Sequence, residues 1–349
     1  MNRPLRKYLF NLLIMFFAGG TLILLFGDGP RPDQPVRGQS ITVIARPLLI
    51  PPGNVDIPTS LSLKLLDAWE LNSKTRSFGG LSGLQASGNS LVFMSDSGAM
   101  VRLVRGGSNK NWRGTISALP NECSADAGKK ERDTESIITD PKTGTLWIGF
   151  EMRNGLCRIA SPEYGGTRFY QPERMKAWPN TGGAEAMVKL RGGSFLIFAE
   201  RPQDSGPIAD LLLFDRDPTD PKAKVTQMGY RPPTGYRPVD AAQLPDGRVL
   251  VLNRRFQIPF AFSARLTIID LPSSIRGRIW GGPIVARFDG DVLGENFEAM
   301  AIDNDGENLT VWMATDDNYM DIQRTLLLRF IWPGAARSKR GVEGRPKPR

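Results

Sequence analysis

A unit of short strands that recurs about every 50 residues constrains this chain more than any other feature of its sequence. In each of five units a small or acidic residue opens a short apolar strand, a turn follows, and a strongly apolar strand ends in a polar residue. The opening residues, separated by 53, 50, 55 and 58 positions, are Ser82, Glu135, Glu185, Asp240 and Glu298. Glycine-containing turns between β-rich runs are hairpin signals. Repeats of this length built from short strands are typical of β-propeller blades.

The predicted fold is therefore all-β, a β-propeller over residues 39–333. Five units are visible, and residues 41–71 and 325–332 supply further strand material near the two ends. Because propellers commonly close by pairing strands from both ends, we predict six blades, with five or seven as the alternatives. A helical solenoid would need amphipathic periods of about 3.6 residues, which the sequence does not contain after residue 26.

Residues 1–28 predict an export signal. Three basic residues precede the uncharged run 8–26, which is longer than the usual ~7–15-residue core of a signal peptide and approaches the ~20 residues that span a bilayer. A cleaved signal peptide and an uncleaved, membrane-anchoring helix both fit, and both export the body, to be held at the inner membrane in the periplasm or secreted after cleavage. Residues 29–38 are predicted to be a linker and the basic residues 334–349 a disordered tail.

The two ends also account for the net charge of +9. Residues 1–26 contribute +3 and residues 335–349 contribute +5, which leaves +1 for the rest of the chain. We therefore expect no nucleic-acid partner, since that binding depends on basic surface. In an exported protein Cys123 and Cys157 are expected to form a disulfide, with two unrelated buried thiols as the alternative.

The sequence contains no histidine, which excludes a Ser-His-Asp triad and the usual histidine-built zinc sites. Chemistry then rests on carboxylates, Arg, Tyr, Ser or a metal bound by oxygen. Residues repeated at one blade position form a ring about a propeller axis, and converging carboxylates repel unless a cation joins them. Oxygen ligands suit Ca²⁺, with Mg²⁺ as the alternative. The candidate ligands are Glu135, Glu185, Glu200, Asp240, Asn253, Glu298 and Asp316. The alternative is that these acids are structural and accept backbone N–H groups at strand ends.

Two hypotheses of function follow. In the first, the protein is a hydrolase in which a metal assists cleavage of an anionic ester at the channel mouth. Its proposed catalytic residues are Glu185 and Glu298 as ligand or general base, with Arg201 and Arg324 binding an anionic small-molecule ester. In the second, the protein is a non-catalytic propeller, anchored to the membrane through its N-terminal segment, that binds a partner or ligand. That hypothesis predicts acids paired with arginines.

Several motifs resemble the phytase-like family known as "esterase-like activity of phytase". They lie at residues 78–84, 95–98, 133–136, 183–187, 296–301, 315–318 and 323–328. The resemblance covers roughly residues 60–332 and implies an exported bacterial propeller-like domain with phosphoester or ester hydrolysis. The layout is also similar to six-bladed calcium lactonases, in which Glu135, Glu185, Asn253 and Asp316 would be the analogous set by position.

Overall fold

The computed structural model describes residues 38–51, 55–56, 63–107, 110–124, 129–200, 206–257, 261–271, 279–304 and 308–332. The predicted N-terminal signal or anchor, the linker up to residue 37, the tail and Arg201 lie outside these residues. Within them no helix is both long and apolar enough to cross a membrane. The described chain is mostly β-strand, with short helical turns between strands.

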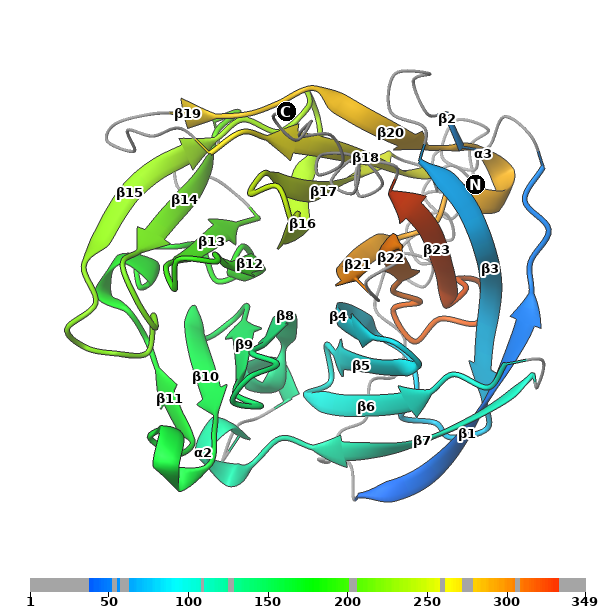
Figure 1. Cartoon of the computed structure of the whole chain (residues 1–349), viewed down its shortest axis with the longest axis horizontal. Coiled ribbons are helices and arrows are strands. Elements are labelled where there is room, and N and C mark those ends of the chain that lie inside the picture. Colours follow the sequence, from blue (N-terminus) through cyan, green and yellow to red (C-terminus); the bar gives the residue numbers. More distant parts are fainter. Residues whose placement is uncertain are drawn as a thin grey trace, which may run out of the picture.

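Five antiparallel meanders of four strands account for most of the described residues, and Figure 1 shows them arranged around a common centre. The first contains β4 (Leu81–Ser87), β5 (Ser90–Ser95), β6 (Ala99–Val104) and β7 (Asn111–Ala118). The second contains β8 (Thr134–Thr139), β9 (Leu146–Phe150), β10 (Gly155–Ile159) and β11 (Arg168–Tyr170). The third contains β12 (Ala184–Lys189), β13 (Phe195–Ala199), β14 (Ala209–Phe214) and β15 (Val225–Tyr230).

The remaining two meanders complete the ring. The fourth contains β16 (Arg237–Gln243), β17 (Val249–Gln257), β18 (Ala261–Ile269) and β20 (Ile284–Phe288), and the fifth contains β21 (Phe297–Asn304), β22 (Leu309–Thr315), β23 (Leu326–Trp332) and β3 (Lys64–Ser73). Two-residue strands extend the third and fourth meanders at their outer edges: β19 (Ile279–Trp280) pairs with β15, and β2 (Val55–Asp56) pairs with β20. Five inner strands, β4, β8, β12, β16 and β21, therefore face the centre (Figure 1).

Strands from the two ends of the chain close the ring. β23, the last described strand, pairs with β3, and β1 (Gln39–Pro47) lies between β3 and β7. The predicted pairing of the two ends is therefore present, but these strands complete the fifth meander instead of forming a further one. The prediction of six blades is not confirmed, and the described strands form five such meanders.

The apolar repeat corresponds to the second strand of each meander. Every residue of β9, β13 and β22 is buried, because each of these strands lies in a sheet that is covered on both faces. Continuous apolar runs are expected for strands of this kind. Packing between adjacent sheets thus places the starts of the inner strands, and the polar residues that end the second strands, around one axis.

The short helical segments lie in connections between strands. They are α2 (Asn121–Ser124), α3 (Gly290–Leu293) and the 3₁₀ turns at Lys129–Arg132, Pro162–Tyr164 and Glu173–Met175. Near α2 the structure joins Cys123 and Cys157 in a disulfide, with 5.5 Å between their Cα atoms. Cys157 lies in β10. The bond therefore ties the segment between β7 and β8 to the body of the second meander.

Candidate functional site

The same β-bulge occurs near the start of all five inner strands. In each meander the register against the second strand shifts at one residue. The residues skipped by the pairing are Ser82, Glu135, Glu185, Val239 and Glu298. Bulges bend a strand and redirect its side chains, and they are common beside active sites. The repeated bulge places three glutamates at equivalent positions of the ring.

The second strands contribute another set of equivalent positions. The residue that pairs just before the bulge is Ser95, Phe150, Ala199, Asn253 or Thr315. The residue after it in each unit is Asp96, Glu151, Glu200, Arg254 or Asp316. Four of these five residues are acids, and one is basic.

The fourth meander differs by one position from the sequence prediction. Asp240 pairs with Leu252, and Asn253 pairs with Pro238, so the positions equivalent to Glu185 and Glu200 are held by Val239 and Arg254. A shift of one residue moves side chains to the other face of a strand. The predicted alignment of Asp240 and Asn253 with the ring acids is therefore wrong.

The contacts of these two residues show what they do instead. Asp240 is buried and accepts hydrogen bonds from the backbone N–H groups of Met300, at 2.6 Å, and Ala241, at 2.7 Å. Burial raises the pKa of the Asp240 carboxyl, and the two N–H donors lower it in part. Asn253 accepts a hydrogen bond from the Tyr230 hydroxyl and donates one to Thr267 Oγ1. Both residues join strands, as the structural alternative expects for acids and amides at strand ends.

Five carboxylates converge where the second and third meanders meet. Oxygen atoms of Asp133, Glu135 and Glu151 lie within 4.8 Å of one another, and so do those of Glu151, Glu185 and Glu200. Glu151 belongs to both groups. Gly183 allows this approach, because a Cβ atom there would lie 2.5 Å from the Cα atom of Glu151. We call these five residues the acidic cluster.

Two members of the cluster have strongly perturbed acidity. The Glu185 side chain is largely buried, with the residue 6% exposed. Burial, and next the carboxylates of Glu200, Glu151 and Glu298, raise the pKa of Glu185 well above its usual value. The pKa of Glu135 is also raised well above its usual value, first by burial and then by Glu185, Asp133, Glu151 and Glu298. Burial is the larger cause of both shifts, and a bound cation would offset the carboxylate repulsion that adds to it.

Arg254 supplies a positive charge beside the cluster. Its guanidinium group donates to Glu298 Oε1 at 2.5 Å and to Glu200 Oε1 at 3.0 Å, and it also contacts the amide oxygen of Asn296. Arg237 lies 3.4 Å from the other oxygen of Glu200. Burial lowers the pKa of Arg254, but Glu298, Glu200, Glu185 and Asp316 together raise it above its usual value. Two of the predicted ligands, Glu200 and Glu298, therefore have an arginine partner.

Asp316 lies on a different part of the ring. Burial, and then Glu298, Asp96 and Asp317, raise the pKa of the Asp316 carboxyl well above its usual value. Its Oδ1 atom accepts a hydrogen bond from the backbone N–H of Asn318 at 2.6 Å. Among the described residues, neither group of carboxylates close enough to share a metal ion includes Asp316. The structure thus separates Asp316 from Glu135 and Glu185.

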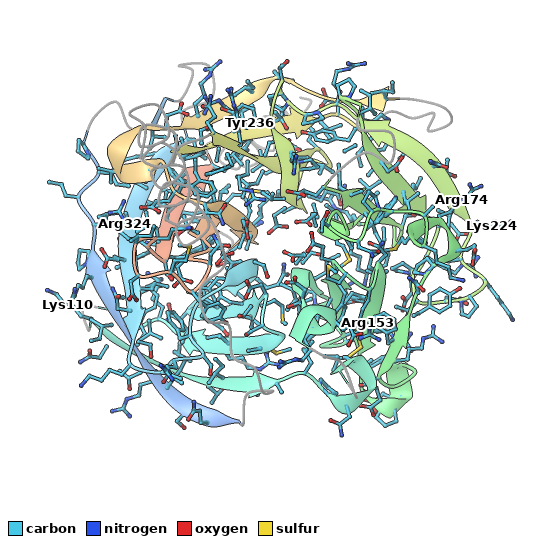
Figure 2. All side chains as sticks on the ribbon, turned by 180° about the vertical axis from the view of Figure 1, so that it is seen from behind. Lys110, Arg153, Arg174, Lys224, Tyr236 and Arg324 are labelled. Atoms are coloured by element: carbon cyan, nitrogen blue, oxygen red, sulfur yellow. A yellow bond between two sulfur atoms is a disulfide. The ribbon has the colours of Figure 1, made fainter. Side chains whose placement is uncertain are left out.

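The arginine beside the ring acids is Arg254, and the predicted Arg324 lies elsewhere. Arg324, labelled in Figure 2, donates to Glu295 Oε1 at 2.7 Å and to the backbone oxygen of Val292. It is therefore engaged at α3, and Arg254 takes the position beside the ring acids. Arg254 follows Asn253 directly in the sequence, so a one-residue change of alignment would have identified it. Asp133 was absent from the predicted ligands because it precedes β8 and breaks the repeat.

The turn that carries Glu151 is supported by packing. Arg153, labelled in Figure 2, lies over the Phe169 ring at 3.5 Å and donates to the backbone oxygen of Cys123 at 2.6 Å. Asn154, at a positive φ of 42°, donates to the backbone oxygen of Trp178. These contacts hold the β9–β10 turn against Cys123, Phe169 and Trp178, so Glu151 projects from a restrained turn.

The family model described as "Phytase-like: Esterase-like activity of phytase" matches residues 76–319. No curated protein sequence matches the chain. Among solved structures, the allergen Mala s 1 of Malassezia sympodialis is 12% identical, with 77% of this chain and 88% of that chain covered and a TM-score of 0.41. The α-L-arabinofuranosidase PaAbf62A of Podospora anserina is 13% identical, with 72% and 91% covered and a TM-score of 0.42. The β-propeller domain of Cps50 (Swd1) from Myceliophteria thermophila is 9% identical, with 82% and 99% covered and a TM-score of 0.37.

Proposed function

This chain belongs to the phytase-like family, and from that premise we propose that it is a metal-assisted hydrolase of a phosphoester, ester or lactone. We further propose that the five meanders are the blades of a five-bladed propeller, exported to the periplasm by the N-terminal segment. The acids and Arg254 at the centre of the ring are the proposed active site.

The observation that carries the proposal is the environment of Glu185. Its carboxylate is largely buried between those of Glu151 and Glu200. No hydrogen bond or ion pair to it is formed by any residue of the described chain. An isolated buried carboxylate is costly, and it is normally paired or bound to a metal. Glu185 is therefore suited to bind a cation together with its two neighbours.

The donor set fits a calcium ion. Carboxylate oxygens are the ligands that Ca²⁺ prefers, at about 2.3–2.6 Å, so two oxygens on one ion lie up to about 5 Å apart. The 4.8 Å limit of the Glu151, Glu185 and Glu200 group meets this requirement. Mg²⁺ is the alternative cation. When bound, such a cation polarises the scissile group and lowers the pKa of a coordinated water.

The remaining steps belong to residues of this chain. Arg254 offers a guanidinium group to an anionic ester, and a guanidinium binds phosphate or carboxylate through paired hydrogen bonds. On binding the ester, Arg254 releases Glu298, whose Oε1 it holds at 2.5 Å. The Glu298 carboxylate then accepts the proton of the attacking water and returns it to the leaving oxygen.

Thermal unfolding of the full chain tests the cation. We expect EDTA to lower the unfolding midpoint and calcium to raise it, with a gain of about 2.7 kcal/mol when free calcium is 100 times its dissociation constant. Glu185→Gln should lose this response, whereas Glu163→Gln, an exposed glutamate of a 3₁₀ turn, should keep it. Hydrolysis of p-nitrophenyl phosphate and p-nitrophenyl acetate should then depend on calcium. A midpoint indifferent to both calcium and EDTA would rule out the metal mechanism.

The second candidate function is a non-catalytic periplasmic module that binds a ligand or partner. It is favoured by the ion pairs of Arg254 with Glu200 and Glu298, which are contacts expected of structural acids. Under this function the calcium response would be absent and no ester would be cleaved.

A further inference from the structure

The acidic cluster consists of two overlapping groups with one shared member. Asp133 directly precedes β8 and Glu135 lies in it, whereas Glu185 lies in β12 and Glu200 directly follows β13. Glu151, in the turn after β9, has carboxylate oxygens close to both pairs. A carboxylate has two oxygens and can bind two cations at once. Glu151 is placed to do this.

The charges of the cluster exceed what one divalent cation offsets. Five carboxylates lie in the two groups, and a single divalent cation balances two negative charges. Arg254 and Arg237 both pair with Glu200, and Arg254 also pairs with Glu298. A second divalent cation would offset two further negative charges, which matters because charges out of contact with water cost several kcal/mol each.

An independent observation points to bound ligands. Glu185 is 6% exposed and its carboxylate is directed at Glu151 and Glu200, with no hydrogen-bond or ion-pair partner among the described residues. Glu135, which belongs to the other group that contains Glu151, likewise has no such partner in the described part of the chain. Each of the two groups thus contains, besides Glu151, one glutamate without a hydrogen-bond or ion-pair partner among the described residues.

We infer that the cluster binds two divalent cations bridged by Glu151, one with Asp133 and Glu135 and one with Glu185 and Glu200. This inference rests on the proposed function and extends it. Pairs of cations about 3.5–4 Å apart hold both the attacking and the leaving oxygen of an ester during in-line displacement. The two-cation site would favour phosphoesters, which offer two equatorial oxygens, over carboxylic esters.

Manganese binding to the full chain tests the bridge without depending on activity. Mn²⁺ is the probe, its stoichiometry is measured by equilibrium dialysis, and its electron paramagnetic resonance spectrum reports whether the two ions interact. We expect two ions per chain with an exchange-coupled spectrum. Glu135→Gln should reduce the stoichiometry to one and leave an uncoupled six-line signal. Glu151→Gln should weaken both sites at least tenfold, and Glu163→Gln should leave both intact.

The number of manganese ions bound distinguishes failure of the bridge from failure of the metal-assisted function. One ion per wild-type chain, or two uncoupled ions, would overturn the bridge and leave the single-cation hydrolase standing. No bound ion would overturn the bridge and the metal-assisted function together. If Glu151→Gln does not fold, as judged by circular dichroism, the wild-type spectrum and Glu135→Gln still decide the outcome.

Discussion

Two neighbouring parts of the ring share one backbone geometry but differ in how their carboxylates are balanced by positive charge. The acidic side comprises Asp133, Glu135, Glu151 and Glu185, whose carboxylates gather with raised pKa values at Glu135 and Glu185. The paired side comprises Arg254, Glu298 and Glu200, joined by ion pairs of 3.0 and 2.5 Å, and Glu200 belongs to the acidic cluster as well. Arg254 and Glu151 occupy equivalent register positions of two meanders. One basic residue thus distinguishes a site with its own counter-charge from the site for which a cation is proposed.

This comparison shows that a ring of acids is not uniform in function. On the paired side the protein supplies its own counter-charge, so those acids can be stable without a metal. On the acidic side the described residues give Glu135 and Glu185 no such partner. Removing a carboxylate should therefore change the free energy of unfolding with opposite signs on the two sides.

The largest loss of stability is expected when the paired side loses the positive charge of Arg254. Arg254→Met leaves Glu200, which is 5% exposed, and Glu298 without their shared ion pair. Removing one partner of a buried ion pair costs about 3–5 kcal/mol. Urea unfolding in EDTA should show a loss of this size. Arg254→Met combined with Glu298→Gln should recover part of it, and a loss below about 1 kcal/mol in the single variant would mean that the pair is not a buried one.

Single Glu→Gln changes should then separate the two sides by sign. In EDTA, Glu135→Gln removes repulsion and should raise the free energy of unfolding by about 1 kcal/mol, whereas Glu298→Gln removes an ion pair and should lower it by a similar amount. Urea unfolding measures both. With saturating calcium the Glu135→Gln advantage should disappear. Equal losses for both variants in EDTA would contradict the difference between the sides.

The smallest effect concerns Asp316, whose pKa is raised above the ordinary 3.8 by burial and by Glu298, Asp96 and Asp317. Because the folded chain holds this proton to higher pH than the unfolded chain does, its contribution makes the free energy of unfolding fall as pH rises above 3.8. Asp316→Asn removes that contribution. In EDTA the variant should gain roughly 0.5–1 kcal/mol on wild type by about pH 8 and almost nothing near pH 4. A deficit that grows with pH would contradict this sign.

Much of the fold could be predicted from local patterns. The apolar second strands, the turns and the recurrence at Ser82, Glu135, Glu185 and Glu298 follow from side-chain alternation and turn chemistry, and all appear in the structure. The blade number could not be predicted in the same way. Whether β3 and β23 form a separate sheet or complete an existing one depends on long-range pairing, and the structure places them side by side in the fifth meander.

Only part of the site could be predicted from the spacing of the repeat. Glu135, Glu185 and Glu200 were identified from their spacing, and the structure brings them together with Asp133 and Glu151. Asp240 and Asn253 were assigned one residue away from the true ring positions. A bulge adds one residue to a strand, and no residue type in this sequence marks its position. The spacing alone therefore does not locate the bulge.

Local periodicity and composition are enough to predict the all-β character, the repeat, the absence of histidine and the acids at the starts of the repeated units. Three features depend on packing: the ring of five meanders, the pairing of Arg254 with Glu200 and Glu298, and the membership of Glu151 in both groups of acids. The cause is distance. Coulombic repulsion and ion pairing act over a few ångströms, and residues from different meanders reach that range only after the sheets have packed around their common axis.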